Sequence, residues 1–119
     1  MQLKNFNWPT EFDSPDVPGS GVNMQKSTLI KLEKACDIAN MSFVINSAYR
    51  TDAHNKKVGG VDDGAHETGH AVDIKAVGSR VRFIILSALL QAGFTRVGVY
   101  KRFIHADDDP ALPQQVLWY

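Results

Sequence analysis

The chain has 119 residues, of which 44% are hydrophobic, so it is about the size of one domain with a single core. Lysine plus arginine and aspartate plus glutamate number 13 each, which excludes recruitment to nucleic acid or an anionic membrane by bulk charge. No apolar run approaches the roughly 18 residues of a membrane span, and the first residues lack the apolar region of a signal peptide. We therefore expect a protein made in the cytoplasm, without membrane insertion, whose partner is chosen by a site.

The beginning of the chain, residues 1–23, is rich in proline, glycine and polar residues and is predicted to be a loop. Three aromatic residues, Phe6, Trp8 and Phe12, interrupt its polar character. Aromatic side chains in such a segment are typical of an arm that is pinned to a domain. We expect residues 1–23 to dock on the single domain formed by residues 1–119.

The next elements alternate between helical and strand patterns. Ser27 is a plausible N-cap for a helix to about Asn40, Thr51 for a short helix to about Lys57, and a third helix follows Gly78 and ends at Gly93. Cys36 is the only cysteine, which excludes an internal disulfide. It falls on the apolar face of the first helix. Short β-branched segments predict strands at residues 42–47, 71–75, 95–100, 102–106 and 115–119, the last at a sheet edge. The pattern predicts an α+β fold in which a small antiparallel sheet packs with helices.

Residues 62–74 gather two histidines and four carboxylates, which no fold needs for packing. Residues 66–70 satisfy H-E-x-x-H, in which two histidines one helical turn apart bind zinc and the glutamate is a general base. That site needs a helix, and Gly69 inside it would cost about 1 kcal/mol relative to alanine. A further glutamate ligand is also missing downstream, because the only glutamates are Glu11, Glu33 and Glu67.

A second interpretation takes His66 from the loop and Asp73 from the following strand. His105 is a candidate third ligand, because it lies in an apolar strand where an unpaired polar side chain is costly. Two histidines and one carboxylate with an open fourth position are the ligands of a catalytic zinc. The spacing alone leaves open that each histidine is an ordinary surface or hydrogen-bonded residue.

Four blocks of sequence occur in the order and with the gaps of a known family: residues 47–50 (S-A-Y-R), 58–60 (V-G-G), 66–74 (H-E-T-G-H-A-V-D-I) and 103–107 (F-I-H-A-D). Together they resemble the zinc D-alanyl-D-alanine carboxypeptidase family, which includes bacterial carboxypeptidases, dipeptidases and phage endolysins. The fold of that family is shared with the hedgehog signalling domain. The last seven residues, 113–119, resemble tails of its phage-type members.

The resemblance implies a Zn²⁺ ion bound by His66, Asp73 and His105. It also implies that Arg50 binds a substrate carboxylate or carbonyl oxygen, for which its fork of donors is suited, and stabilises charge on a tetrahedral intermediate. Tyr49, which adjoins Arg50, is expected at the substrate-binding side. The alternative for Arg50 is a structural salt bridge to a nearby aspartate.

The chain departs from the family at the general base. Arg102 stands where many members have an acidic residue, three positions before the last histidine. Asp107 is then the candidate base, or else it orients His105 through the other ring nitrogen. Gly64 replaces a serine that is common near the substrate. Glu67 and His70 are expected to take no part.

The resemblance therefore implies a monomeric zinc metallopeptidase that cleaves a peptide bond in peptidoglycan stem peptides with a zinc-activated water. Both a D-Ala-D-Ala carboxypeptidase and an endolysin-type endopeptidase fit. Such an enzyme would reach the cell wall after release by a holin, or as part of a virion. The alternative is a zinc-containing structural or binding module whose activity has lapsed, for which Arg102 and Gly64 are the arguments.

Overall fold

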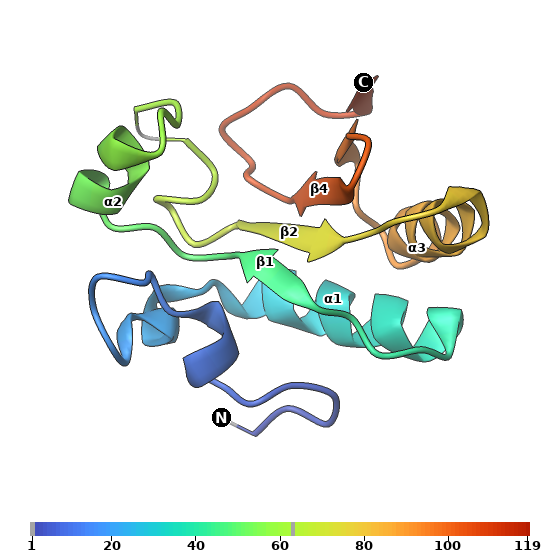
Figure 1. The fold of residues 1–119 in the computed structure, drawn as a ribbon, viewed down its shortest axis with the longest axis horizontal. Helices are drawn as coiled ribbons and strands as arrows, with labels where there is room; N and C mark the ends of the chain where they lie inside the picture. The colour runs from blue at the N-terminus through green and yellow to red at the C-terminus, as the bar shows by residue number, and fades with distance from the viewer. Residues whose placement is uncertain (1, 63) are drawn as a thin grey trace.

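The computed structural model describes residues 2–62 and 64–119, so Met1 of the predicted arm and Asp63 of the histidine-rich stretch lie outside the described residues. The elements in chain order are the 3-10 turns η1 (Thr10–Phe12) and η2 (Ser20–Asn23), α1 (Lys26–Ala39), β1 (Ile45–Ser47), α2 (Asp52–Lys57), β2 (Ala71–Lys75), α3 (Ser79–Gln91), β3 (Arg96–Val99), β4 (Phe103–Asp107) and β5 (Val116–Trp118). Figure 1 shows their arrangement. Among the described residues, no helix is long and apolar enough to cross a membrane.

The five strands form one sheet in the order β1-β2-β4-β3-β5. The predicted α+β class is confirmed, and the first four strands in this order pair antiparallel. The last strand lies at the edge as expected but runs parallel to β3, which makes the sheet mixed. This direction follows from the chain path: residues 108–115 turn the chain back after β4, so β5 runs opposite to β4 and hence alongside β3.

The two faces of the sheet differ because side chains alternate along a strand. Val72 and Ile74 of β2 and Ile104 and Ala106 of β4 are fully buried and belong to the hydrophobic core. The same core contains the apolar residues of α1 and α3, including Leu29, Leu32, Ile85 and Leu89. The two long helices therefore cover one face, and the opposite face carries Asp73 and His105.

The segment before α1 lies against the domain. Phe6 and Phe12 are buried in the core, with their ring centroids 5.5 Å apart in an edge-to-face arrangement. The backbone N–H groups of Lys4 and Asn5 donate to the carboxylate of Glu33 on α1, at 2.7 and 2.9 Å. The 3-10 turns η1 and η2 form where the sequence predicts loop, because turns of three or four residues leave no periodic pattern.

Two predicted helix caps have opposite outcomes. Thr51 caps α2 as predicted, since its Oγ1 accepts a hydrogen bond from the backbone N–H of His54 at 3.2 Å. The predicted cap at Ser27 is wrong: α1 begins at Lys26, and the Ser27 hydroxyl donates instead to Oδ2 of Asp108 at 2.8 Å. This partner is 81 residues away in the chain, so a local sequence pattern could not have predicted the hydrogen bond.

Candidate metal centre

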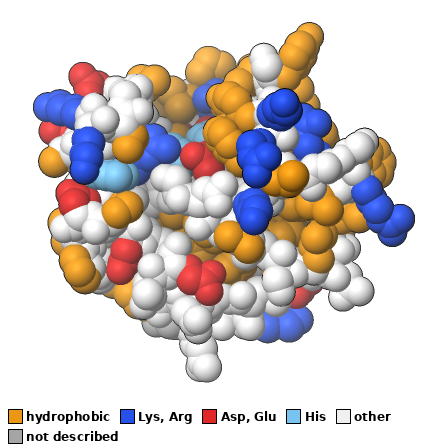
Figure 2. Space-filling view, in the orientation of Figure 1, with side chains coloured by type: hydrophobic (Ala, Val, Ile, Leu, Met, Phe, Trp, Pro, Cys, Tyr) orange, Lys and Arg blue, Asp and Glu red, His pale blue; other side chains and the backbone are white. Residues whose placement is uncertain are grey.

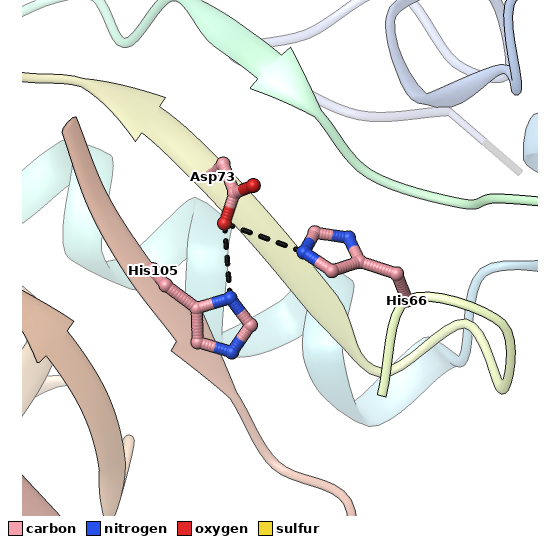
Figure 3. Close-up of side chains that lie close together, drawn as sticks. All are labelled: His66, Asp73 and His105. Atoms are coloured by element: carbon pink, nitrogen blue, oxygen red, sulfur yellow. Dashed lines mark hydrogen bonds and ion pairs between the residues drawn. The ribbon is translucent and has the colours of Figure 1, made fainter. Parts of the chain in front are cut away.

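Three side chains converge on the open face of the sheet, from a turn and two strands (Figure 3). His66 comes from the turn that precedes β2, Asp73 from the middle of β2 and His105 from the middle of β4. Asp73 and His105 are direct cross-strand partners, which places their side chains next to one another on the same face. The three residues proposed as ligands therefore lie together, although His66 and His105 are far apart in the chain.

The spacing of their donor atoms fits a zinc ion. Oδ1 of Asp73 lies 3.3 Å from Nε2 of His66 and 2.9 Å from Nδ1 of His105. The donor atoms of the three residues all lie within 4.8 Å of one another. Ligands of a tetrahedral zinc with bonds of about 2.1 Å are about 3.4 Å apart. One ion could thus contact all three donors after small side-chain adjustments.

The other ring nitrogen of each histidine is already bonded. Nδ1 of His66 lies 2.7 Å from the backbone oxygen of Ala48, which can only accept, so this nitrogen carries the proton. Nε2 of His105 lies 2.6 Å from Oδ2 of Asp107, an arrangement in which the proton sits on Nε2. The nitrogens that face Asp73, Nε2 of His66 and Nδ1 of His105, donate to its carboxylate in the absence of a metal, and they are the ones that would bind a metal after losing their protons.

The electrostatics of the site keep the central carboxylate ionised. Burial alone would raise the pKa of Asp73, but hydrogen bonds from His105 and His66 outweigh it and hold this pKa well below its usual range. Burial would likewise lower the pKa of His105, yet the carboxylates of Asp107 and Asp73 raise it. Asp73 is therefore held in the ionised form that a metal ligand requires.

Asp107 lies behind His105 and is almost fully buried, at 1% exposure. Its Oδ2 faces His105, and its Oδ1 accepts from Nε of Arg96 at 2.7 Å and from the backbone N–H of Asp109 at 3.3 Å. Burial opposes ionisation, but His105 and Arg96 lower the pKa of Asp107. Both oxygens are engaged, so the geometry favours the orienting role over that of a general base.

Arg50 follows β1 and points along the edge of the site. Its guanidinium donates to Oγ of Ser47 at 3.0 Å, to Oδ1 of Asn55 at 3.2 Å and to Oδ2 of Asp73 at 3.4 Å. The salt bridge uses the Asp73 oxygen that does not face the histidines. Arg50 thus has the structural ion pair expected as the alternative, and it also lines the cavity above the ligands.

A cavity of about 490 Å³ opens over the three ligands. One wall is the segment after α2, and the other is mainly aromatic: Gly59, Gly60, Val61, Asp62 and Gly64 form the first, and Tyr100, Phe103, Leu112 and Trp118 the second. Figure 2 shows this hollow, with acidic, basic and histidine atoms in its floor and hydrophobic atoms on the C-terminal side. Sequence reasoning missed the aromatic wall, because its members come from three separate segments.

Two residues singled out from the sequence lie elsewhere. Tyr49 packs against the hydrophobic core and is outside the cavity lining, so this placement gives no support to a substrate contact. Arg102, which replaces the usual acidic residue, is exposed immediately before β4 and is also outside the lining.

The H-E-x-x-H interpretation is wrong for this chain. Residues 66–69 form turns instead of a helix, and Gly69 has a φ of +80°. His70 directs Nδ1 to the Thr68 hydroxyl at 2.8 Å, and Glu67 accepts a hydrogen bond from Asn55 at 2.8 Å. Neither side chain belongs to the group formed by His66, Asp73 and His105.

Comparison with known proteins identifies a family for the chain. A family model described as Peptidase M15 matches residues 1–107, which include all three candidate ligands and Arg50. The matched segment leaves out residues 108–119, and with them part of the aromatic wall. No curated protein matches the chain.

Proposed function

The chain belongs to the peptidase M15 family of zinc peptidases, and on this premise we propose that it hydrolyses a peptide bond in the stem peptides of bacterial peptidoglycan. The observation that carries the proposal is the convergence of Nε2 of His66 and Nδ1 of His105 on the Asp73 carboxylate, at the floor of an open cavity. A D-Ala-D-Ala carboxypeptidase and an endolysin-type endopeptidase both fit this arrangement.

In the proposed reaction, the three metal ligands, Arg50 and Asp107 each have a separate role. His66, Asp73 and His105 would hold a zinc ion, which would supply Lewis-acid chemistry and lower the pKa of water. Arg50 lines the cavity, and its N–H groups beyond those that bond to Ser47, Asn55 and Asp73 would hold a substrate carboxylate or stabilise the developing oxyanion. Asp107 keeps the proton of His105 on Nε2 and so fixes the ring for binding through Nδ1.

The partner in this proposal is the peptide stem, bound by a monomer. Peptidoglycan stems carry carboxylates and amide groups that Arg50 can recognise. The protein would meet them after release from the cytoplasm, as lytic enzymes of phages do, or as a component of a virion. Mass spectrometry of the products from defined muropeptides would identify the bond that is cleaved.

The test combines metal content with peptide-bond cleavage. Purified protein should bind about one zinc per chain and release new amino groups from purified peptidoglycan. His66→Ala, Asp73→Ala and His105→Ala should lose both properties. His70→Ala is the matched control, because this histidine lies in the same stretch but bonds to Thr68. Unchanged zinc content and cleavage in the three ligand variants would refute the proposal.

The second candidate is a zinc-containing binding module without hydrolytic activity. Two observations favour it: the position of the usual acid holds the exposed Arg102, and both oxygens of Asp107 are engaged, by His105 and Arg96. A module of this kind would bind zinc and co-sediment with peptidoglycan, yet release neither amino groups nor free D-alanine. Metal content alone does not separate the two candidates, because both keep the ligands.

A further inference from the structure

Trp118 reaches the metal centre by lying across a glycine. Gly98 of β3 pairs with His105 on one side and with Trp118 on the other. A Cβ atom at Gly98 would come within 2.3 Å of Nε1 and 2.5 Å of Cε2 of the Trp118 indole. The missing side chain at residue 98 is therefore what lets the indole fold onto the open face of the sheet.

Three contacts hold the indole in this position. Its Nε1 donates to the hydroxyl of Tyr100 at 2.8 Å, and the guanidinium carbon of Arg96 lies 5.4 Å from its ring centroid. On the other side, its ring centroid is 5.4 Å from that of His105. Arg96 also donates to Asp107, which in turn bonds to His105. The guanidinium of Arg96 therefore contacts the indole and also orients His105 through Asp107. Such a ring is rigid and offers apolar area at little entropic cost.

The aromatic ring next to Trp118 extends the apolar surface. Tyr100 stacks on Phe103 with ring centroids 4.4 Å apart and an angle of 9° between the planes. Leu112 completes this wall of the cavity. The indole offers carbon atoms to the cavity, since its polar atom is already bonded to the Tyr100 hydroxyl.

Arg50 and Trp118 lie on opposite sides of the metal ligands. Arg50 follows the edge strand β1, and Trp118 belongs to the other edge strand, β5. The ligand-bearing strands β2 and β4 lie between them. A substrate that crosses the site would therefore meet Arg50 at one end and the aromatic wall at the other.

The geometry points to Trp118 as a specificity residue: the indole, with Tyr100, forms the subsite for an aliphatic side chain on the acyl side of the scissile bond. This inference rests on the proposed peptidase function and names a part of its substrate. We assign an aliphatic side chain because the wall is mainly aromatic and apolar. We assign the residue next to the scissile bond because the indole adjoins the candidate metal ligand His105. Trp118 lies beyond the residues matched by the family model.

The probes are N-acetylglycine, N-acetylalanine and N-acetylnorvaline, each a product of the acyl side that cannot be hydrolysed. The D and L forms of the chiral probes are both used, because it is not assumed which peptide bond, and hence which configuration, the site accepts. Affinity for the zinc-loaded protein is measured by calorimetry or NMR titration. Binding should tighten about fourfold for each CH₂ group that the wall buries, from glycine to norvaline, in one of the two configurations.

Two variants remove the subsite in different ways. Trp118→Ala deletes the indole, and Gly98→Ala displaces it with a new Cβ while leaving the indole in the chain. In both variants, the affinities for N-acetylnorvaline and N-acetylglycine should differ by no more than about twofold. Leu117→Ala is the matched control, because its side chain is next in the same strand and is 49% exposed. It should keep the wild-type ratio. Zinc content and circular dichroism verify that each variant is folded.

The outcomes separate the subsite from the proposed function. A flat affinity series in the wild-type protein, or a ratio that Trp118→Ala leaves unchanged, would overturn the subsite. Failure of the wild-type protein to release amino groups from peptidoglycan would overturn the enzymatic function, while an affinity series that depends on Trp118 would still establish the binding site.

Discussion

Oδ2 of Asp107 lies 2.6 Å from Nε2 of His105, on the side of the ring that faces away from Asp73. This relationship determines which nitrogen of His105 is available to a metal. Arg96 holds the same carboxylate from the other oxygen at 2.7 Å, so the orientation of the ring depends on a chain of three side chains.

Asp107→Asn should weaken zinc binding by about 10- to 100-fold, because an amide can turn its NH₂ group toward Nε2 and favour the wrong tautomer of His105. Competition with a chromophoric chelator measures the affinity. Asp37→Asn is the matched control, since Asp37 bonds to Lys4 and Asn5 and belongs to neither group of described residues that could hold a metal. If Asp107 were instead the general base, zinc affinity would be unchanged and only turnover would fall.

Arg50→Lys should lower the turnover of peptidoglycan substrates on the order of 10²-fold while the protein still binds zinc under excess metal. Lysine keeps the charge but lacks the planar fork that serves Ser47, Asn55 and the cavity together. Steady-state release of amino groups gives the rate. Arg102→Lys, an exposed position outside the cavity lining, should have no effect. Equal rates for both variants would remove Arg50 from the proposed mechanism.

Gly69→Ala should destabilise the protein by about 3 kcal/mol or more, as measured by urea unfolding. The residue has a φ of +80°, and a Cβ atom there would lie 2.2 Å from the backbone oxygen of Asn23. Gly59→Ala separates these two causes. Its φ of +77° is similar, but nothing lies within 4 Å of the added Cβ, so the cost should be only about 1 kcal/mol. Equal losses in the two variants would mean that the contact with Asn23 is unimportant.

The contribution of Asp16 to stability should disappear in acid. Hydrogen bonds from the hydroxyls of Ser14 and Thr51 lower the pKa of Asp16, so the folded state favours the ionised form. Its contribution is therefore complete above the unfolded pKa of about 3.9 and is lost as the pH falls through the lower folded value. The difference in unfolding free energy between wild type and Asp16→Asn, followed from pH 7 to pH 2, should shrink over that window. A difference that stays constant with pH would exclude this ionisation as its source.

Much of the local structure could be predicted because it depends on neighbouring residues. The alternation in residues 71–75 predicts β2 with its observed bounds and places Asp73 on the face opposite Val72 and Ile74. Thr51 as the cap of α2 follows from local chemistry in the same way. The predicted N-cap at Ser27 was wrong because the partner of its hydroxyl, Asp108, is distant in the chain.

Chain composition and order by themselves determined the α+β class, the candidate ligands and the family resemblance, since these depend on residue types and their spacing. Only the tertiary structure decided that Asp73 and His105 are cross-strand partners, that the outer ring nitrogens of His66 and His105 face the Ala48 oxygen and the Asp107 carboxylate, and that H-E-x-x-H forms no helix. It also placed Trp118 over Gly98. Each of these depends on strand register and on contacts between distant segments, which no local pattern of residues encodes.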